Sequence, residues 1–201
     1  MHAPRARIHA LVLGLLLASA PARAQLLNPN FEAGDNPGGS LLLLQGSQAI
    51  AGWSVSGTGL YYAGTDWAPS DGARSVGLYL NGPGGRSAIS QRFPTPPGTA
   101  YVVLFHYAPA PLSGPLLHRE LRVRAAGQEA AFSTQGVGTA GNPGWRLGTW
   151  TFSAVGDSTT LEFANEYDSY SGGVLLDGVL VTTPLPARRS SWGVIHDLYR
   201  R

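Results

Sequence analysis

Short runs of strand-forming residues, each ended by turn-forming residues, constrain the fold of this chain more than any other feature. The chain contains 27 glycines and 15 prolines in 201 residues, and only 13% of its residues are charged. After Gln25 no segment keeps an apolar stripe of helical period for three turns, whereas short alternating or continuous apolar runs recur. The pattern therefore predicts many short strands and no long helices.

Eleven segments have the pattern of a strand: Leu41–Gln45, Gly52–Val55, Leu60–Ala63, Arg74–Leu80, Ala88–Phe93, Tyr101–Tyr107, Leu116–Ala125, Glu129–Ser133, Arg146–Ser153, Thr159–Ala164 and Val174–Thr182. About ten short strands with turn signals between them predict an all-β fold, a two-sheet antiparallel β-sandwich of the jelly-roll type. Arg119 interrupts the apolar side of its segment, so we expect that strand to begin at an exposed edge.

Residues 1–24 have the three parts of a secretory signal peptide. Two arginines, Arg5 and Arg7, precede an acid-free apolar run from Ile8 to Ala20, and Ala22-Arg23-Ala24 follows. The run is shorter than the roughly 20 residues that a membrane-spanning helix needs. We therefore expect cleavage before Gln25, no membrane span, and a secreted protein that is extracellular or at the cell surface.

The formal net charge of +2 is unevenly distributed along the chain. Residues 25–182, the expected domain, carry 7 arginines and 11 acidic residues, a net charge of −4, whereas residues 183–201 carry +3. A domain of negative charge has no electrostatic surface for nucleic acid, so we expect no nucleic-acid partner. The chain has no cysteine, which excludes disulfides and thiolate metal sites.

Residues 183–201 are predicted to form a linker and a short basic amphipathic tail. Trp192, Ile195 and Tyr199 have a spacing that places them on one side of a helix, and arginines follow them. The tail is either a device for association with the cell envelope or a frayed terminus, and the sequence favours neither.

Several motifs in residues 26–182 resemble known secreted domains. Leu-Asn-Pro-Asn-Phe-Glu at 27–32, Gly52-Trp53 and Leu-Leu-Asp-Gly-Val at 175–179 look like the galactose-binding-like jelly rolls. The central pattern from Tyr62 to Leu78, with 89–93 and 97–101, resembles the secreted bacterial choice-of-anchor C proteins, which are similar to plant cell-wall domains of unknown function. The resemblance implies a jelly roll that binds, or is embedded in, extracellular polysaccharide.

The same resemblance implies a structural calcium ion held by Glu32 and Asp177. In carbohydrate-binding modules of this fold, an acid near the N-terminus and an aspartate of the last strand meet on one side of the sandwich. Calcium takes six to eight oxygen ligands, which carboxylates and backbone carbonyls can supply. In the alternative interpretation Glu32 is solvated and Asp177 closes a turn before Gly178.

Two loop-rich stretches combine aromatic and polar side chains, as sugar-binding sites do, because sugars present apolar C–H faces and hydroxyls. The first candidate set is Tyr61, Tyr62, Trp67, Asp71 and Arg74, and the second is Tyr167, Asp168 and Tyr170. The alternative for each residue is an exposed loop side chain without a ligand. The remaining large aromatic residues are expected to pack in the core or at its rim: Trp53, Trp145, Trp150 and Phe152.

Catalytic signatures are weak in this sequence. It contains no Gly-x-Ser-x-Gly, no His-Glu-x-x-His and no P-loop. Glu162, Glu166 and Asp168 could supply a glycosidase pair only if two carboxyl groups lay roughly 5–10 Å apart. We therefore expect a non-catalytic carbohydrate-binding module for polysaccharide or oligosaccharide, and not an enzyme. The alternative is a structural or adhesive cell-envelope protein with a protein partner.

Overall fold

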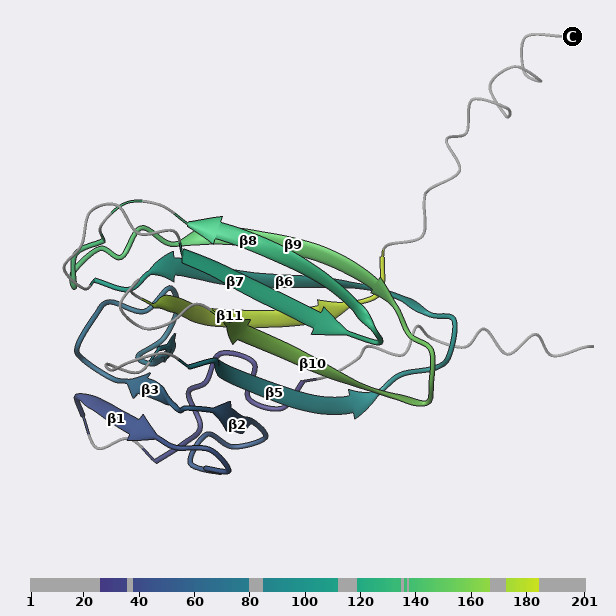
Figure 1. Ribbon diagram of the computed structural model, residues 1–201, viewed down its shortest axis with the longest axis horizontal. Helices are drawn as coiled ribbons and strands as arrows, with labels where there is room; N and C mark the ends of the chain where they lie inside the picture. The colour runs from purple at the N-terminus through teal and green to yellow at the C-terminus, as the bar shows by residue number, and fades with distance from the viewer. Residues whose placement is uncertain are drawn as a thin grey trace, which may run out of the picture.

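The computed structural model describes residues 26–35, 38–79, 85–111, 119–134, 136, 138–166 and 173–184. In these residues the fold is all-β, with eleven strands in two antiparallel sheets and no helix, which confirms the predicted fold class (Figure 1). No helix that could cross a lipid bilayer occurs in this part of the chain. The predicted signal peptide and C-terminal tail lie outside the described residues.

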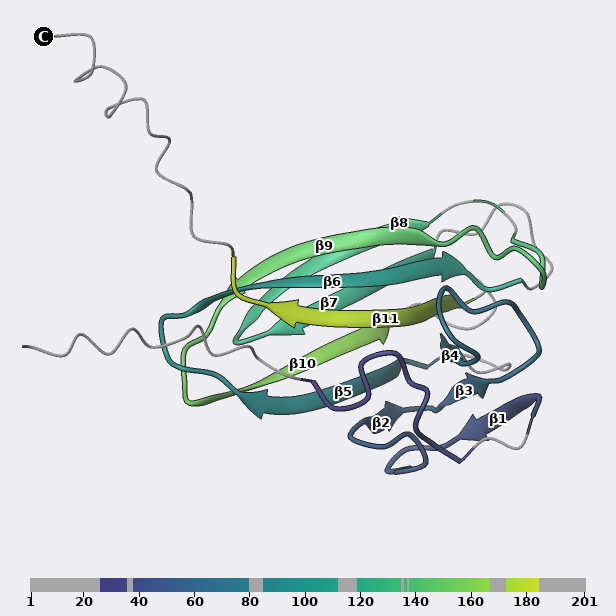
Figure 2. The ribbon, with the colours of Figure 1, turned by 180° about the vertical axis from the view of Figure 1, so that it is seen from behind.

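The first sheet has six strands in the order β1-β3-β4-β11-β6-β9, and the second has five in the order β2-β5-β10-β7-β8 (Figures 1 and 2). The strands of the first sheet are β1 (Ser40–Leu43), β3 (Leu60–Ala63), β4 (Ser75–Leu78), β6 (Ala100–Pro109), β9 (Arg146–Ser153) and β11 (Val174–Thr182). Those of the second are β2 (Ser54–Gly57), β5 (Ser87–Pro94), β7 (Arg119–Ala125), β8 (Gln128–Thr134) and β10 (Ser158–Asn165).

The main core lies between the two sheets, where the inward side chains of both sheets meet. Strand alternation produces it: in β6, Tyr101, Val103 and Phe105 are fully buried, whereas Val102 and Leu104 are half-buried on the outward face. Trp53 and Phe31 pack in the same core with ring centroids 5.0 Å apart. A second, smaller apolar cluster lies outside this core, with Trp67, Tyr79, Ala108 and Leu175 among its members.

Arg119 contradicts the expectation that its strand starts at an exposed edge. Its side chain is 1% exposed, and β7 lies inside the five-stranded sheet between β10 and β8. Its Nη1 donates a hydrogen bond to the carbonyl of Gly136 at 2.8 Å. Burial lowers the pKa of the Arg119 guanidinium. The Arg119 side chain is therefore buried like those of Leu121 and Val123 in the same strand, and a backbone carbonyl accepts its hydrogen bond.

The loop that joins β3 to β4, residues 64–74, lies against the outward face of the six-stranded sheet, away from the main core (Figure 2). The backbone amide of Ala68 donates to the carbonyl of Ala140, which belongs to the connection between β8 and β9. Two loops far apart in the sequence therefore meet at one end of this sheet.

Candidate functional site

An open cavity of about 420 Å³ lies on the outward side of the six-stranded sheet, and we call it the aromatic cavity. Its lining residues come from β1, β3, the 64–74 loop, the residue after β4, the residues after β6, and the β8–β9 connection. They are Ser40, Tyr61, Asp66, Trp67, Tyr79, Pro111 and Ala140. Three of the seven are aromatic, and one is an acid.

Strand alternation selects which tyrosine reaches this cavity. Leu60 and Tyr62 of β3 are fully buried in the main core, so Tyr61 between them points to the outward face and packs against the second cluster. The Tyr61 and Tyr79 rings have centroids 5.1 Å apart at an angle of 46°, and those of Trp67 and Tyr79 are 6.3 Å apart at 41°. The three rings form one continuous wall.

Close packing fixes Trp67 and Tyr79 in this wall. Each is 5% exposed, whereas Tyr61 is half-buried. Trp67 Nε1 donates to Ser75 Oγ at 2.8 Å. Gly77 lies beneath both rings, and a Cβ at this position would be 2.7 Å from Tyr79 Cε1 and 3.1 Å from Trp67 Cη2. Only glycine lets the two rings lie this close to β4. Because Trp67 and Tyr79 are almost fully buried and Tyr61 is only half-buried, Tyr61 is the ring that is most available to a ligand.

A buried carboxylate fastens the 64–74 loop to the sheet. Asp177 of β11 is 0% exposed. Its Oδ2 accepts hydrogen bonds from Ser70 N and Ser70 Oγ, both at 2.8 Å, and from Asp71 N at 3.2 Å. Its Oδ1 accepts one from Gly178 N at 2.7 Å. Burial raises the pKa of Asp177, and these hydrogen bonds act in the opposite direction.

Glu32 fastens the same loop from the N-terminal side. Its Oε1 accepts hydrogen bonds from Ala73 N at 2.9 Å and Arg74 N at 3.0 Å. Gly72 lies against this carboxylate, because a Cβ there would be 2.3 Å from Glu32 Oε1, and its φ is +65°. Glu32 and Asp177 are therefore brought to one loop, and both serve it as hydrogen-bond acceptors.

Hydrogen-bond donors face both carboxylates in this structure. Amide N–H groups and one hydroxyl face Asp177 Oδ1 and Oδ2, and donors of this kind stabilise an anion rather than a cation. Within the described residues, no three His, Asp or Glu side chains lie close enough to hold a metal ion together. The calcium ion that the resemblance implies for Glu32 and Asp177 stays a prediction for experiment.

Only part of the first candidate set of ligand residues lines the aromatic cavity. Tyr62 is buried in the main core, and its hydroxyl donates to the Phe31 carbonyl at 2.5 Å. The Arg74 guanidinium lies over the Tyr62 ring, 5.4 Å from its centroid. Asp71 is exposed on the 64–74 loop. Of the first candidate set, Tyr61 and Trp67 line the cavity.

The second candidate set, Tyr167, Asp168 and Tyr170, lies outside the described residues. Among the aromatic residues expected to pack, Trp53 and Phe152 are buried and Trp150 packs against the main core. Trp145 packs against the second cluster, and its Nε1 donates to the Ala68 carbonyl at 3.0 Å, which joins the two loops beside the cavity.

Sequence reasoning missed Tyr79 and Asp66. Val76 and Leu78 of β4 point into the main core, so Gly77 and Tyr79, which alternate with them, should face outward. Strand alternation could therefore have placed Tyr79 on the outward face. Asp66 precedes Trp67 in the candidate stretch and was not singled out. No pattern in a single sequence signals the contributions of Pro111 and Ala140, which depend on how the loops meet.

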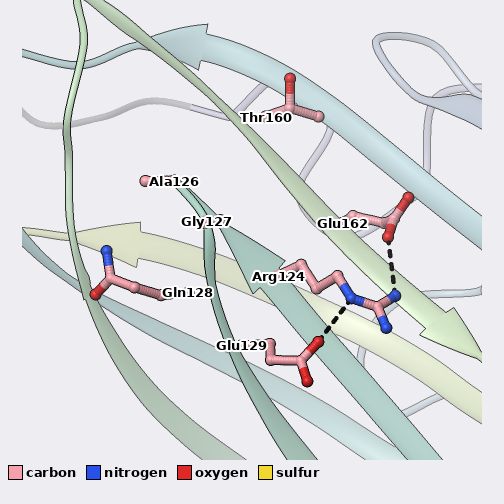
Figure 3. Close-up of a pocket in the computed structure, with 8 residues that line it drawn as sticks. Arg124, Ala126, Gly127, Gln128, Glu129, Thr160 and Glu162 are labelled. Carbon is pink, nitrogen blue, oxygen red and sulfur yellow. Dashed lines mark hydrogen bonds and ion pairs between the residues drawn. The ribbon is translucent and has the colours of Figure 1, made fainter.

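A second cavity, of about 370 Å³, lies on the outward face of the five-stranded sheet and has a different character (Figure 3). Polar groups at the β7–β8 hairpin and β10 line it, including Arg124, Gln128, Glu129, Thr160 and Glu162. Arg124 contacts three carboxylates: Nε lies 2.9 Å from Glu129 Oε2, Nη1 3.3 Å from Glu162 Oε1, and Nη2 2.6 Å from Glu166 Oε1.

Ion pairs extend beyond this cavity over the same sheet face. Arg122 contacts Glu120, Glu129 and Glu166, and Arg86 contacts Glu162 and Glu166. The hydrogen bond from Arg124 lowers the pKa of Glu129. Glu162 and Glu166, the described members of the glycosidase set, are thus each shared by two or more arginines. Their carboxylates are therefore engaged in ion pairs over this sheet face.

The comparisons place this chain among jelly-roll domains. A family model described as "Protein of unknown function (DUF642)" matches residues 24–182. The structure of TmCBM61 in complex with beta-1,4-galactotriose aligns with a TM-score of 0.53 at 19% identity, covering 81% of this chain and 100% of that one. Arabinose-bound MgGH51 α-L-arabinofuranosidase aligns with a TM-score of 0.56 at 14% identity, covering 83% of this chain and 27% of that one.

At these identities the two structures establish a shared fold, and this chain corresponds to about a quarter of the arabinofuranosidase. The search of curated proteins gives no match. The family model spans almost all of the described sandwich. The jelly-roll sandwich shares the fold of TmCBM61, and the chain belongs to the DUF642 family.

Proposed function

We propose that this protein is a secreted, non-catalytic module that binds extracellular or cell-wall polysaccharide through the aromatic cavity. The observation that carries the proposal is the joint presence of Tyr61, Trp67 and Tyr79 with the exposed carboxylate of Asp66 in one open cavity. Aromatic rings provide apolar contact for sugar C–H faces, while the polar groups bind hydroxyls.

The known structures support the proposal through their ligands. TmCBM61 was determined with a galactotriose, and it shares the fold over its whole length. The resemblance to choice-of-anchor C and plant cell-wall domains favours a polysaccharide outside the cell. The pairing of Glu162 and Glu166 with arginines supports binding without hydrolysis.

The test is retention of the purified chain on insoluble polysaccharides, with variants matched across the two sheet faces. We expect Tyr61→Ala to lower affinity at least tenfold, because the most accessible ring is removed. Thr160→Ala, on the outward face of the other sheet, should bind like the wild type. Equal retention of the two variants would contradict the assignment of the cavity, and release of reducing ends by the wild type would contradict the absence of catalysis.

One observation favours the alternative of an adhesive protein with a protein partner. Leu147 of β9 and Leu180 of β11 are 61% and 52% exposed on the outward face that carries the cavity. Exposed apolar side chains on one face are typical of protein interfaces. If soluble oligosaccharide fails to compete with envelope binding and Leu180→Ser abolishes it, the alternative holds.

Secretion and envelope association rest on segments outside the described residues. We expect the exported protein to begin at Gln25, which N-terminal sequencing would show. Deletion of 184–201 followed by cell fractionation tests the tail. A shift from the envelope to the medium would assign retention to the tail, and an unchanged distribution would assign it to the sandwich.

A further inference from the structure

Asp66 gives the aromatic cavity a negative charge that the described structure does not neutralise. Its side chain is exposed on the 64–74 loop and lines the cavity beside the rings. The carboxylate lies against the start of β1, because a Cβ placed on Gly39 would be 3.3 Å from Asp66 Oδ1. No arginine within the described ranges forms an ion pair with it.

Six of the seven arginines in the described residues have partners away from the aromatic cavity, and Arg146 of β9 is exposed but does not belong to the cavity lining. Arg86, Arg122 and Arg124 pair with glutamates over the five-stranded sheet, and Arg92 donates to Ser158. Arg74 lies over Tyr62, which belongs to the main core. None of these side chains lines the aromatic cavity. A negatively charged ligand would therefore meet a carboxylate without a compensating cation.

The charge of Asp66 reaches the rings of the cavity. Burial is the main cause that raises the pKa of Tyr79, and the neighbouring Tyr61 and Asp66 raise it further. The Tyr79 hydroxyl therefore stays protonated at ordinary pH. The cavity lining thus combines one carboxylate acceptor with an uncharged tyrosine hydroxyl.

We propose, resting on the proposed function, that the aromatic cavity selects uncharged saccharides and rejects uronic acids, with Asp66 as the residue that determines this specificity. A neutral sugar can donate its hydroxyls to the Asp66 carboxylate, and charge-assisted hydrogen bonds of this kind are among the stronger ones. A uronate brings a second carboxylate into a partly enclosed, ring-lined space, where two like charges repel each other.

The experiment compares matched polysaccharides that differ in charge alone. Polygalacturonate and its fully methyl-esterified form share a backbone, and neutral galactan and arabinan complete the set. We expect the wild type to bind neutral polysaccharides and the methyl ester at least tenfold more tightly than polygalacturonate, which corresponds to about 1.4 kcal/mol. The preference should weaken as salt is raised, because salt screens the repulsion.

Two variants that each remove one negative charge show whether Asp66 causes the preference for neutral polysaccharides. Asp66→Asn should reduce the discrimination against polygalacturonate at least fivefold. Asp71→Asn removes the same charge from the same loop but outside the cavity lining, so it should keep the wild-type preference. Both positions are exposed, and thermal melting verifies that each variant is folded.

The outcomes separate this inference from the proposed function. If the wild type binds polygalacturonate as tightly as neutral polysaccharides, the selectivity is refuted while glycan binding stands. If Asp66→Asn and Asp71→Asn have equal effects, the assignment to Asp66 is refuted. If no saccharide binds at all, both the inference and the proposed function are wrong.

Discussion

The two outward faces of this sandwich follow the same strand alternation but carry opposite chemistry. On the five-stranded sheet, Arg124 is paired with Glu129 and Glu162 (Figure 3). Arg86 and Arg122 are also paired with glutamates, so polar groups satisfy one another. On the six-stranded sheet, rings line a cavity and Asp66 has no cationic partner in the described structure. Unpaired groups on a surface are the ones that a ligand can use, so the comparison favours the six-stranded face for the proposed binding.

The largest effect is expected where the 64–74 loop is attached to the six-stranded face. Asp177→Ala removes the acceptor for the amides of Ser70, Asp71 and Gly178. Unsatisfied buried donors make unfolding easier by about 3 kcal/mol, roughly 6–12 °C for a chain of this size. Asp71→Ala, in the exposed part of the loop, is the control for thermal melting. Equal melting temperatures for the two variants would show that the carboxylate does not hold the loop.

A smaller effect is expected from a methyl group beneath the rings. In Gly77→Ala the new Cβ would meet Tyr79 and Trp67, and overpacking of this kind destabilises by about 1–3 kcal/mol. We also expect weaker polysaccharide retention, because the rings must move. Gly141→Ala is the matched control, since a Cβ there has no neighbour within 4 Å. If Gly77→Ala retains polysaccharide as well as Gly141→Ala, the ring arrangement is not required for binding.

On the five-stranded face, a substitution should change the free energy of unfolding through charge, in a salt-dependent way, more than through packing. Arg124→Met removes the guanidinium that contacts Glu129, Glu162 and Glu166. We expect a loss of about 1 kcal/mol in urea unfolding, because exposed ion pairs contribute little individually. The loss should shrink at high salt, and polysaccharide retention should stay unchanged. A loss that grows with salt would mean that the arginine acts through packing of its aliphatic stem.

The smallest effect concerns calcium. Because hydrogen-bond donors already surround Asp177, we expect melting temperatures in millimolar calcium and in chelator to agree within about 2 °C, a difference below about 1 kcal/mol. A larger increase in calcium would show that Glu32 and Asp177 bind the ion, as the resemblance implies, and that the loop rearranges to do so.

The strands were predictable because alternation and turn residues are local signals. Leu60–Ala63, Arg146–Ser153 and Val174–Thr182 have the same bounds in the sequence prediction and in the structure. Arg119 was the exception, since a charged residue on an apolar side was interpreted as an edge. A single guanidinium can instead be buried when its stem packs inward and a carbonyl accepts its hydrogen bond.

The site was predictable only in part, because its residues meet through sheet order. Tyr61 and Trp67 were predicted as ligand residues and line the cavity, whereas Tyr62 points to the other side of the same strand. Tyr79 reaches Tyr61 because β3 pairs with β4, with Tyr61 opposite Gly77. A single sequence carries turn and alternation signals but not the pairing of distant strands, so Pro111 and Ala140 could not be placed.

The position of β11 has a consequence for how the molecule is made. This final strand inserts between β4 and β6, so the six-stranded sheet consists of two separate pieces until residues 174–182 have left the ribosome. The same strand carries Asp177, which anchors the ring-bearing loop. The proposed polysaccharide binding therefore requires β11, because a nascent chain can complete the six-stranded sheet and anchor this loop only after residues 174–182 have been made.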